Sequence, residues 1–291
     1  MHSDKRRRLP EWLRISSRLD QDERYIKVRT IVAENQLHTI CTSGNCPNIG
    51  ECWRAGTATF MILGDICTRS CRFCGVTTGR PLPPDDGEPV RVADSIRLMG
   101  LDHAVITSVD RDDLPDRGSG FWALTIRTIR EQNPGVTMET LIPDFDGKPE
   151  WIDCVIQARP EVISHNLETV RRLTPQIRTK ARYETSLSVI RQVSRSGIIA
   201  KSGIMLGLGE TREEVLETMD DLIGAGCSVM TIGQYLQPTR DHLAVTEWVH
   251  PDQFKEYEEE GLRKGFSHVE SHPLVRSSYH AAGHIRRDHE R

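Results

Sequence analysis

From Ala58 onward, the chain alternates between short apolar runs rich in β-branched residues and segments with helical spacing. The apolar runs are TATFMIL, HAVITSV, VTMETLI, EVIS, IIAKSGIML and SVMTIG. Six strand-plus-helix units of roughly 30–40 residues each are typical of βαβ crossovers in a parallel sheet. Right-handed crossovers curl such a sheet toward a barrel, and six units are too few for the closed eight-stranded form. The alternation therefore predicts an α/β fold, a partial (β/α)6 TIM-type barrel.

The segments between the apolar runs carry helix start and stop signals. Thr211 and Glu214 have the spacing of a capping box, and Gly100 suits the left-handed position that follows a helix end. We predict three parts: an N-terminal extension over 1–57, the barrel over 58–265 and a C-terminal extension over 266–291. The two extensions are expected to cover the barrel mouth.

Composition limits the classes of partner. The 291 residues include 38 Lys+Arg and 42 Asp+Glu, a net charge of −4, and 37% are hydrophobic. A globular chain without a strong basic excess is expected, with no wholesale attraction to nucleic acid or membrane. No run approaches the ~18 apolar residues of a membrane span. The basic start MHSDKRRRLPEWLR has no apolar run behind it, so we expect a cytoplasmic protein.

Six of the eight cysteines fall between Cys41 and Cys74. Cys67, Cys71 and Cys74 form C-x3-C-x2-C directly after the first predicted strand, where a βα barrel places its active site. Three thiolates ligate three irons of a cubane cluster and leave the fourth iron open. A zinc site is one alternative, although structural zinc usually has four ligands in two pairs. Packing cysteines or a chance cluster are the others.

A second set, Cys41, Cys46 and Cys52, has the spacing C-x4-C-x5-C in CTSGNCPNIGECW. Three more thiols so close to the first set indicate a second cluster, and Pro47 and Gly50 supply the tight turns that wrap one. The alternative is a small zinc site, for which a fourth ligand is missing nearby.

The C-x3-C-x2-C motif resembles the signature of the radical S-adenosylmethionine (SAM) superfamily. In that superfamily the amino and carboxylate groups of SAM chelate the open iron, and an electron from the cluster splits the sulfonium to give a 5′-deoxyadenosyl radical. Phe73 stands where members often carry an aromatic residue near the adenine. Ordinary packing is the alternative for this side chain.

Both cysteine sets together, with RSSYHA near the C-terminus, closely resemble the lipoyl synthases of this superfamily. The similarity extends from about Leu37 to Ala281 and includes CPNIGECW, GTATFMILGDICTR, VITSVDRDDL, HNLETVRRL and KSGIMLGLGET. The resemblance implies a SAM-cleaving [4Fe–4S] cluster on Cys67, Cys71 and Cys74, and an auxiliary [4Fe–4S] cluster on Cys41, Cys46 and Cys52. It also implies that Ser278 is the fourth auxiliary ligand, with Ser277 as the near alternative. From composition alone Ser278 is an unremarkable surface serine.

The resemblance implies a sulfurtransferase (EC 2.8.1.8) that inserts two sulfur atoms at carbons 6 and 8 of a protein-bound octanoyl-lysine. The auxiliary cluster is then the sulfur donor, and two SAM molecules are consumed per lipoyl group. The implied partners are octanoylated carrier domains, such as 2-oxoacid dehydrogenase E2 subunits and the glycine-cleavage H protein, and an electron donor such as ferredoxin or flavodoxin. Arg69, Arg72 and the basic N-terminus are expected to attract the acidic face of a carrier.

Further residues are expected to contact SAM. Asn166 and Glu168 resemble the ribose-contacting pair of sulfur-inserting radical enzymes such as biotin synthase, although Asn166 also suits a helix N-cap. Met205 lies in a segment that resembles the strand along the adenine, where a plain buried strand is the alternative. Thr107 and Ser108 end another strand and are expected near the methionine amine or carboxylate.

Two isolated cations, Lys201 and Arg276, lie in apolar surroundings and require either an ion-pair partner or a functional role. Cys154 and Cys227 stand alone and are expected to pack in the core. Two rival functions remain at this point. One is another two-cluster radical enzyme of the methylthio- or biotin-forming type, and the other is a non-catalytic electron-transfer or zinc-binding module.

Overall fold

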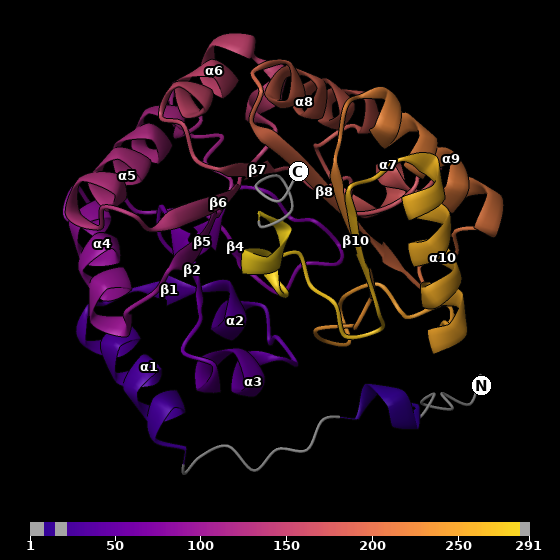
Figure 1. Ribbon diagram of the computed structural model, residues 1–291, viewed down its shortest axis with the longest axis horizontal. Helices are drawn as coiled ribbons and strands as arrows, with labels where there is room; N and C mark the ends of the chain where they lie inside the picture. The colour runs from indigo at the N-terminus through magenta and orange to yellow at the C-terminus, as the bar shows by residue number, and fades with distance from the viewer. Residues whose placement is uncertain (1–8, 15–21, 286–291) are drawn as a thin grey trace.

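Six parallel strands curl into an open barrel in this computed structural model, which describes residues 9–14 and 22–285 (Figure 1). Each strand pairs in parallel with the next in chain order. They are β2 (Thr59–Ile62), β5 (His103–Ser108), β6 (Thr137–Leu141), β7 (Val162–Ser164), β8 (Ile199–Leu206) and β9 (Val229–Gln234). Five strands lie within the apolar runs and β9 extends one residue beyond its run, so the predicted partial barrel is confirmed.

Two further strands extend the sheet at its edges. β1 (His38–Thr39) pairs antiparallel with β2, and β10 (His268–Ser271) pairs in parallel with β9. The strand order runs from β1 to β10 without a pairing between these two, so the barrel stays open along this seam in the part of the chain described. A separate small sheet joins β3 (Ile66–Cys67) to β4 (Thr77–Thr78).

Helices surround the sheet on its outer face (Figure 1). The crossover helices are α4 (Glu88–Met99), α5 (Ser119–Gln132), α6 (Pro149–Gln157), α8 (Tyr183–Arg195) and α9 (Arg212–Gly224), and α10 (Pro251–Lys264) precedes β10. Their apolar faces bury large side chains such as Trp122 and Phe254 against the strands. Burial of such side chains removes apolar surface from water and is the main stabilising contribution of this layer.

Local signals behave as predicted at two helix ends. Thr211 Oγ1 accepts from the Glu214 amide while the Glu214 carboxylate accepts from the Thr211 amide, which is a complete capping box on α9. Gly100 follows α4 with φ of 69°, a left-handed conformation that glycine adopts without a Cβ clash.

Short elements from both ends of the chain fill the open side of the barrel. They are 3-10 helix η1 (Glu11–Leu13), α1 (Glu23–Glu34), α2 (Ile40–Ser43), α3 (Ile49–Arg54) and 3-10 helix η3 (Ala281–His284). Figure 1 shows η3 within the ring of strands and α2 and α3 beside it. Two more short elements, η2 (Phe145–Gly147) and α7 (Thr174–Ile177), lie in the loops after β6 and β7.

A buried ion pair crosses the barrel interior. Lys201 Nζ lies 2.7 and 2.8 Å from the two carboxylate oxygens of Glu139, and neither side chain is exposed. The ion-pair alternative for Lys201 is therefore confirmed. Cys227 is fully buried, as expected of a packing cysteine, and Cys154 is half-buried against the core. None of the described helices is long and apolar enough to cross a membrane.

Candidate active site

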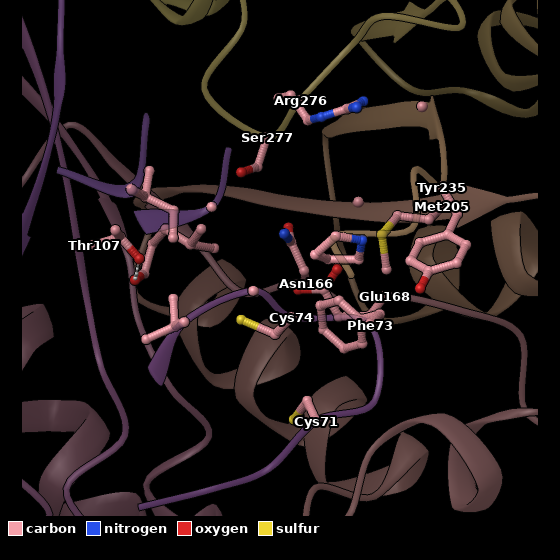
Figure 2. A pocket seen from close by; sticks show the side chains of 18 of the residues that line it. Cys71, Phe73, Cys74, Thr107, Asn166, Glu168, Met205, Tyr235, Arg276 and Ser277 are labelled. Atoms are coloured by element: carbon pink, nitrogen blue, oxygen red, sulfur yellow. Dashed lines mark hydrogen bonds between the residues drawn. The ribbon is translucent and has the colours of Figure 1, made fainter. Parts of the chain in front are cut away.

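A cavity of about 380 Å³ opens at the carboxyl ends of the strands, where barrel enzymes place their active sites. Its walls come from the ends of β5, β6, β8 and β9, from the loop after β7, and from the segment 275–277 near the C-terminus. Figure 2 shows Cys71 and Cys74 on one side of this cavity and Arg276 and Ser277 on the opposite side. Residues that lie far apart in the sequence thus face one enclosed space.

Cys67, Cys71 and Cys74 all line this cavity and none forms a disulfide. Burial, together with the charge of Asp110, raises the pKa of Cys67 to about 11, and burial together with the charges of Cys71 and Cys67 raises that of Cys74 to about 12. The amides of Arg69 and Asp110 each lie 3.4 Å from Cys67 Sγ and donate to it. Three crowded, half-buried thiols with backbone donors fit a metal–sulfur cluster, because iron would compensate the thiolate charge that burial disfavours.

Arg69, between the first two of these cysteines, is held by carboxylates on all sides. Its Nε and Nη2 lie 2.8 Å from the two oxygens of Asp112, and Nη2 lies 2.8 Å from Asp144. Asp110 adds a third contact at 3.3 Å. We call Arg69 with Asp110, Asp112 and Asp144 the Arg69 cluster.

The expectation that Arg69 attracts a carrier domain is wrong, since this side chain is only 6% exposed and its charge is compensated within the protein. Arg72 is exposed and its Nη1 donates to the Gln176 carbonyl. The basic residues at positions 5–8 lie outside the described residues.

The residues expected to contact SAM all lie on the cavity wall. Phe73 and Met205 lie near Asn166 and Glu168 in Figure 2. Asn166 Oδ1 is buried and accepts no hydrogen bond from any described residue. The N-cap alternative is wrong, because no helix begins at Asn166 and the next one, α7, starts at Thr174. An unpaired buried acceptor in a cavity fits a ligand hydroxyl.

Glu168 has an unusual backbone. Its φ of 69° lies in the left-handed region, and its amide and carbonyl pair with Gly203 and Met205 of β8. Burial raises the pKa of its carboxyl group. A strained non-glycine residue held by a neighbouring strand and facing a cavity is typical of a binding site.

Thr107 and Ser108 lie at the expected end of β5, but both side chains have partners in the protein. Thr107 Oγ1 donates to the Leu141 carbonyl, and Ser108 Oγ accepts from Trp122 Nε1, both at 3.2 Å. Each hydroxyl oxygen retains acceptor capacity toward the cavity.

The second cysteine set gathers around α2 and α3. Cys41 is buried, and Cys46 and Cys52 are half-buried beside it. Burial together with the charges of Cys41 and Cys46 raises the pKa of Cys52 to about 12. Asn45 and Pro47, which flank Cys46, line the cavity, whereas the three cysteines of this set do not.

The C-terminal segment is attached to this second loop. Asn48 Nδ2 donates to the Leu274 carbonyl at 2.7 Å, and Tyr279 Oη donates to Glu51 at 3.0 Å. Ser277 lines the cavity, whereas Ser278 accepts a hydrogen bond of 2.9 Å from Thr59. Both serines are half-buried, so Ser278 is not the plain surface residue that composition indicates.

Several cavity residues were not predicted from sequence, among them Asp110, Asp144, His165, Arg178 and Tyr235. The charged run that follows β5, which begins with Asp110, was an available signal, because charges at a strand's carboxyl end are costly unless paired or functional.

Arg276 is the second isolated cation predicted from sequence, and among the described residues it does not have the ion-pair partner that was one of its two alternatives. Its Nη1 donates to backbone carbonyls of Val275 and Gln234, and no carboxylate of the described ranges forms an ion pair with it. Burial lowers the pKa of this guanidinium while the neighbouring Cys46 opposes that shift.

Solved structures share this fold at low sequence identity. Streptococcus suis SuiB bound to the precursor peptide SuiA gives a TM-score of 0.57 at 10% identity over 72% of this chain, which spans only 48% of SuiB. Methylornithine synthase (PylB) gives a TM-score of 0.51 at 13% identity over 96% of this chain and 86% of that enzyme. These likenesses support the barrel alone.

Sequence comparison is more specific. Residues 61–222 match the family model of the radical SAM superfamily. A lipoyl synthase of Bacteroides fragilis is 64% identical over 98% of this chain and 99% of its own length. A lipoyl synthase of Treponema denticola is 56% identical over 96% of this chain and 95% of its own length. From this identity over nearly the full chain and from the matched family model, the chain belongs to the lipoyl synthase family of radical SAM enzymes.

Proposed function

We propose that this protein forms lipoyl groups by inserting two sulfur atoms at carbons 6 and 8 of an octanoyl-lysine on a carrier protein. The observation that carries this proposal is the pair of three-thiol sets, one lining the cavity and the other on a loop whose Asn45 and Pro47 line the same cavity. One set would hold the cluster that cleaves SAM, and the other would hold an auxiliary [4Fe–4S] cluster that is consumed as the sulfur donor.

Cys67, Cys71 and Cys74 would hold the first cluster. With SAM bound, this cluster supplies the 5′-deoxyadenosyl radical that unactivated C–H bonds require. The amide donors on Cys67 stabilise negative charge on its sulfur, and the Arg69 cluster fixes the loop that carries all three thiols. On this side of the cavity the protein would therefore act by positioning the cluster and SAM.

Contacts with SAM would come from the ends of the strands and from Phe73 on the first cysteine loop. The unpaired Oδ1 of Asn166 would accept from a ribose hydroxyl, with the Glu168 carboxyl group next to it. Phe73 and Met205 would give apolar contact to the adenine, and Thr107 and Ser108 would accept from the methionine amine. Enclosure by these side chains would keep water from the radical.

The auxiliary cluster would be bound by Cys41, Cys46 and Cys52, with Ser278 as its fourth ligand and Ser277 as the alternative. A hard oxygen is a poorer ligand for iron than a thiolate, so the serine-bound iron would be released first when sulfide leaves. Burial raises the pKa of Cys46, and Arg276 lies close enough to oppose that shift and would stabilise the anionic cluster before it is consumed. The donor site would thus combine the extensions 1–57 and 266–291 around the barrel 58–265.

The substrates would be octanoylated carrier domains, such as 2-oxoacid dehydrogenase E2 subunits and the glycine-cleavage H protein. A reductant of the ferredoxin or flavodoxin type would supply electrons. Arg72, exposed beside the first cysteine loop, is the remaining candidate for attraction of an acidic carrier.

The test is incubation of the reconstituted protein with SAM, a reductant and an octanoyl-lysine peptide, with thiolated product detected by mass. We expect about eight irons per chain and lipoyl product. Cys46→Ala should still form 5′-deoxyadenosine but no product, while Cys71→Ala should form neither. Cys154→Ala, outside both sets, is the matched control and should behave as wild type. Lipoyl product from Cys46→Ala would overturn the donor assignment.

A further inference from the structure

A second group of potential ligands lies one layer of side chains below the active-site cavity. His268 and Glu270 are alternate residues of β10, so their side chains share a face of the sheet. Glu270 is opposite Thr231 of β9, which lines the cavity. On β8, Lys201 lies two residues before Gly203 of the cavity wall, about 7 Å along a strand. His268, Glu270 and His284 do not line the cavity themselves.

Three donor atoms converge in this layer. His268 Nε2 lies 3.3 Å from a carboxylate oxygen of Glu270, and the ring centroids of His268 and His284 are 4.6 Å apart. Donor atoms of His268, Glu270 and His284 all lie within 4.8 Å of one another. His284 has a fully buried side chain, and its Nε2 has no hydrogen-bond partner among residues 9–14 and 22–285.

We propose that His268, Glu270 and His284 bind a divalent metal ion of the zinc class. Imidazole nitrogen and carboxylate oxygen are ordinary zinc ligands at 2.0–2.2 Å, and tetrahedral geometry at these lengths places donors about 3.3 Å apart. The separation of His268 and Glu270 already has this value. His280 Nδ1 lies 3.3 Å from the other Glu270 oxygen and is not one of the three converging donors, so water would be the fourth ligand.

Two charged side chains lie on the far side of the His284 ring. Its Nδ1 lies 4.0 Å from Glu139 and 3.2 Å from Lys201, whose ammonium can only donate. Metal on Nε2 requires the proton on Nδ1, so metal binding would replace the hydrogen bond from Lys201 with one from Nδ1 to the Glu139 carboxylate, the kind of outer carboxylate found at zinc sites. Lys201 is already compensated by Glu139 at 2.7 Å, so the layer does not present an unpaired cation to the metal.

The site would also have a structural consequence. Its ligands come from β10 and from η3, and the chain between them carries Ser277, Ser278 and Tyr279. A metal there closes a loop around the segment that packs on Glu51 and Asn48. Metal binding would therefore stabilise the folded form of that segment, by a free energy that rises with metal concentration and with affinity.

Cobalt(II) tests this proposal on the full-length protein with its clusters loaded under anaerobic conditions. We expect one Co²⁺ per chain with visible d–d absorption, and X-ray absorption showing nitrogen and oxygen ligands only. His268→Asn and Glu270→Gln should each weaken Co²⁺ binding by at least about tenfold. His272→Asn, an exposed histidine of the same segment, is the matched control and should bind as wild type.

His284 is buried, so His284→Gln is interpreted only with iron content and circular dichroism equal to wild type. Glu270→Gln keeps the proposal testable if that variant fails to fold, because Glu270 is partly exposed and the amide preserves its shape. Equal Co²⁺ affinity in wild type and Glu270→Gln would overturn the site. Sulfur ligation, or no Co²⁺ bound beyond the iron sites, would overturn it as well.

Discussion

The two cysteine loops differ in how they are attached to the barrel. The Cys67–Cys74 loop is held by the Arg69 cluster, by a hydrogen bond from the Thr68 amide to Asp110, and by one from the Arg72 amide to Ile177. The Cys41–Cys52 loop is bound to the C-terminal segment through Asn48 and Tyr279. One loop is thus anchored to the strands, while the other depends on contact between the two ends of the chain.

This difference agrees with the roles proposed for the two loops. Local opening costs little where few buried contacts hold a segment and approaches the global free energy of unfolding where many do. A cluster that stays through every turnover requires a loop that is held by many buried contacts. A cluster that is dismantled and replaced requires a loop that can open. The variants below test whether the two loops can be weakened separately.

Replacement of Arg69 by Met should have the largest effect. It leaves the buried Asp144 without its cation, although Asp112 keeps Lys180 at 2.9 Å, and removal of one partner of a buried pair costs about 3–5 kcal/mol. Urea unfolding should show this loss, and iron should be lost from the first loop while the auxiliary loop keeps its share. Arg72→Met, at an exposed side chain, should stay within about 0.5 kcal/mol of wild type. Equal iron loss from both loops would show that the Arg69 cluster does not act on the Cys67–Cys74 loop alone.

The failed expectation for Arg69 shows where sequence reasoning stops. The cysteine spacing and six apolar runs are local patterns, and the strands and thiol sets follow from them. The partners of Arg69 come from the loops after β5 and β6, and Asp112 is 43 residues away in the chain. Only the parallel order of the strands brings these loops together, and no local sequence pattern shows which loops will become neighbours.

The N-cap interpretation of Asn166 failed for a related reason. Asn166, before LETV, is a residue type that favours N-caps, but Glu168 pairs with β8 in a left-handed conformation and no helix starts there. Tertiary pairing therefore outweighed local helix preference. β10 and η3 were likewise treated as parts of an extension, since a run of four or five residues gives too little periodicity to reveal a sheet partner.

Lowering the pH should reduce the unfolding free energy of the barrel through His165. Burial, reinforced by Arg178, lowers the pKa of this histidine to about 4 in the folded protein, against ~6.5 unfolded. The unfolded state therefore binds the proton first as pH falls, and stability contributed by neutral His165 is lost between about pH 6.5 and 4. His165→Gln should reduce the loss in unfolding free energy between pH 7 and 5 by about 2 kcal/mol. Urea titrations at both pH values measure it, and an unchanged pH dependence would contradict this assignment.

Substitution of Ser277 and Ser278 one at a time distinguishes a role as cluster ligand from a role in packing. Ser278→Ala removes the hydrogen bond with Thr59 and should cost about 1 kcal/mol of stability. If Ser278 is the ligand, the same variant loses auxiliary iron faster in a Cys71→Ala background, which holds only the auxiliary cluster. Ser277→Ala is the matched control. Faster iron loss from Ser277→Ala alone would move the ligand assignment to Ser277.

Tyr279→Phe should give the smallest and most selective effect. It deletes only the hydroxyl that donates to Glu51 at 3.0 Å, while the ring keeps its contact with His280 at a centroid distance of 3.9 Å. A hydrogen bond of about 1 kcal/mol predicts roughly fivefold faster iron release to a chelator from the auxiliary loop, measured again in the Cys71→Ala background.

The same change in a Cys46→Ala background should leave iron release from the first loop unchanged. Tyr25→Phe is the matched control, because Tyr25 touches Trp53 of α3 through its ring and that contact is kept. Faster release from both loops would mean that Tyr279 supports the whole barrel. Release accelerated in the auxiliary loop alone would show that the hydrogen bond between the two ends of the chain limits how often this loop opens.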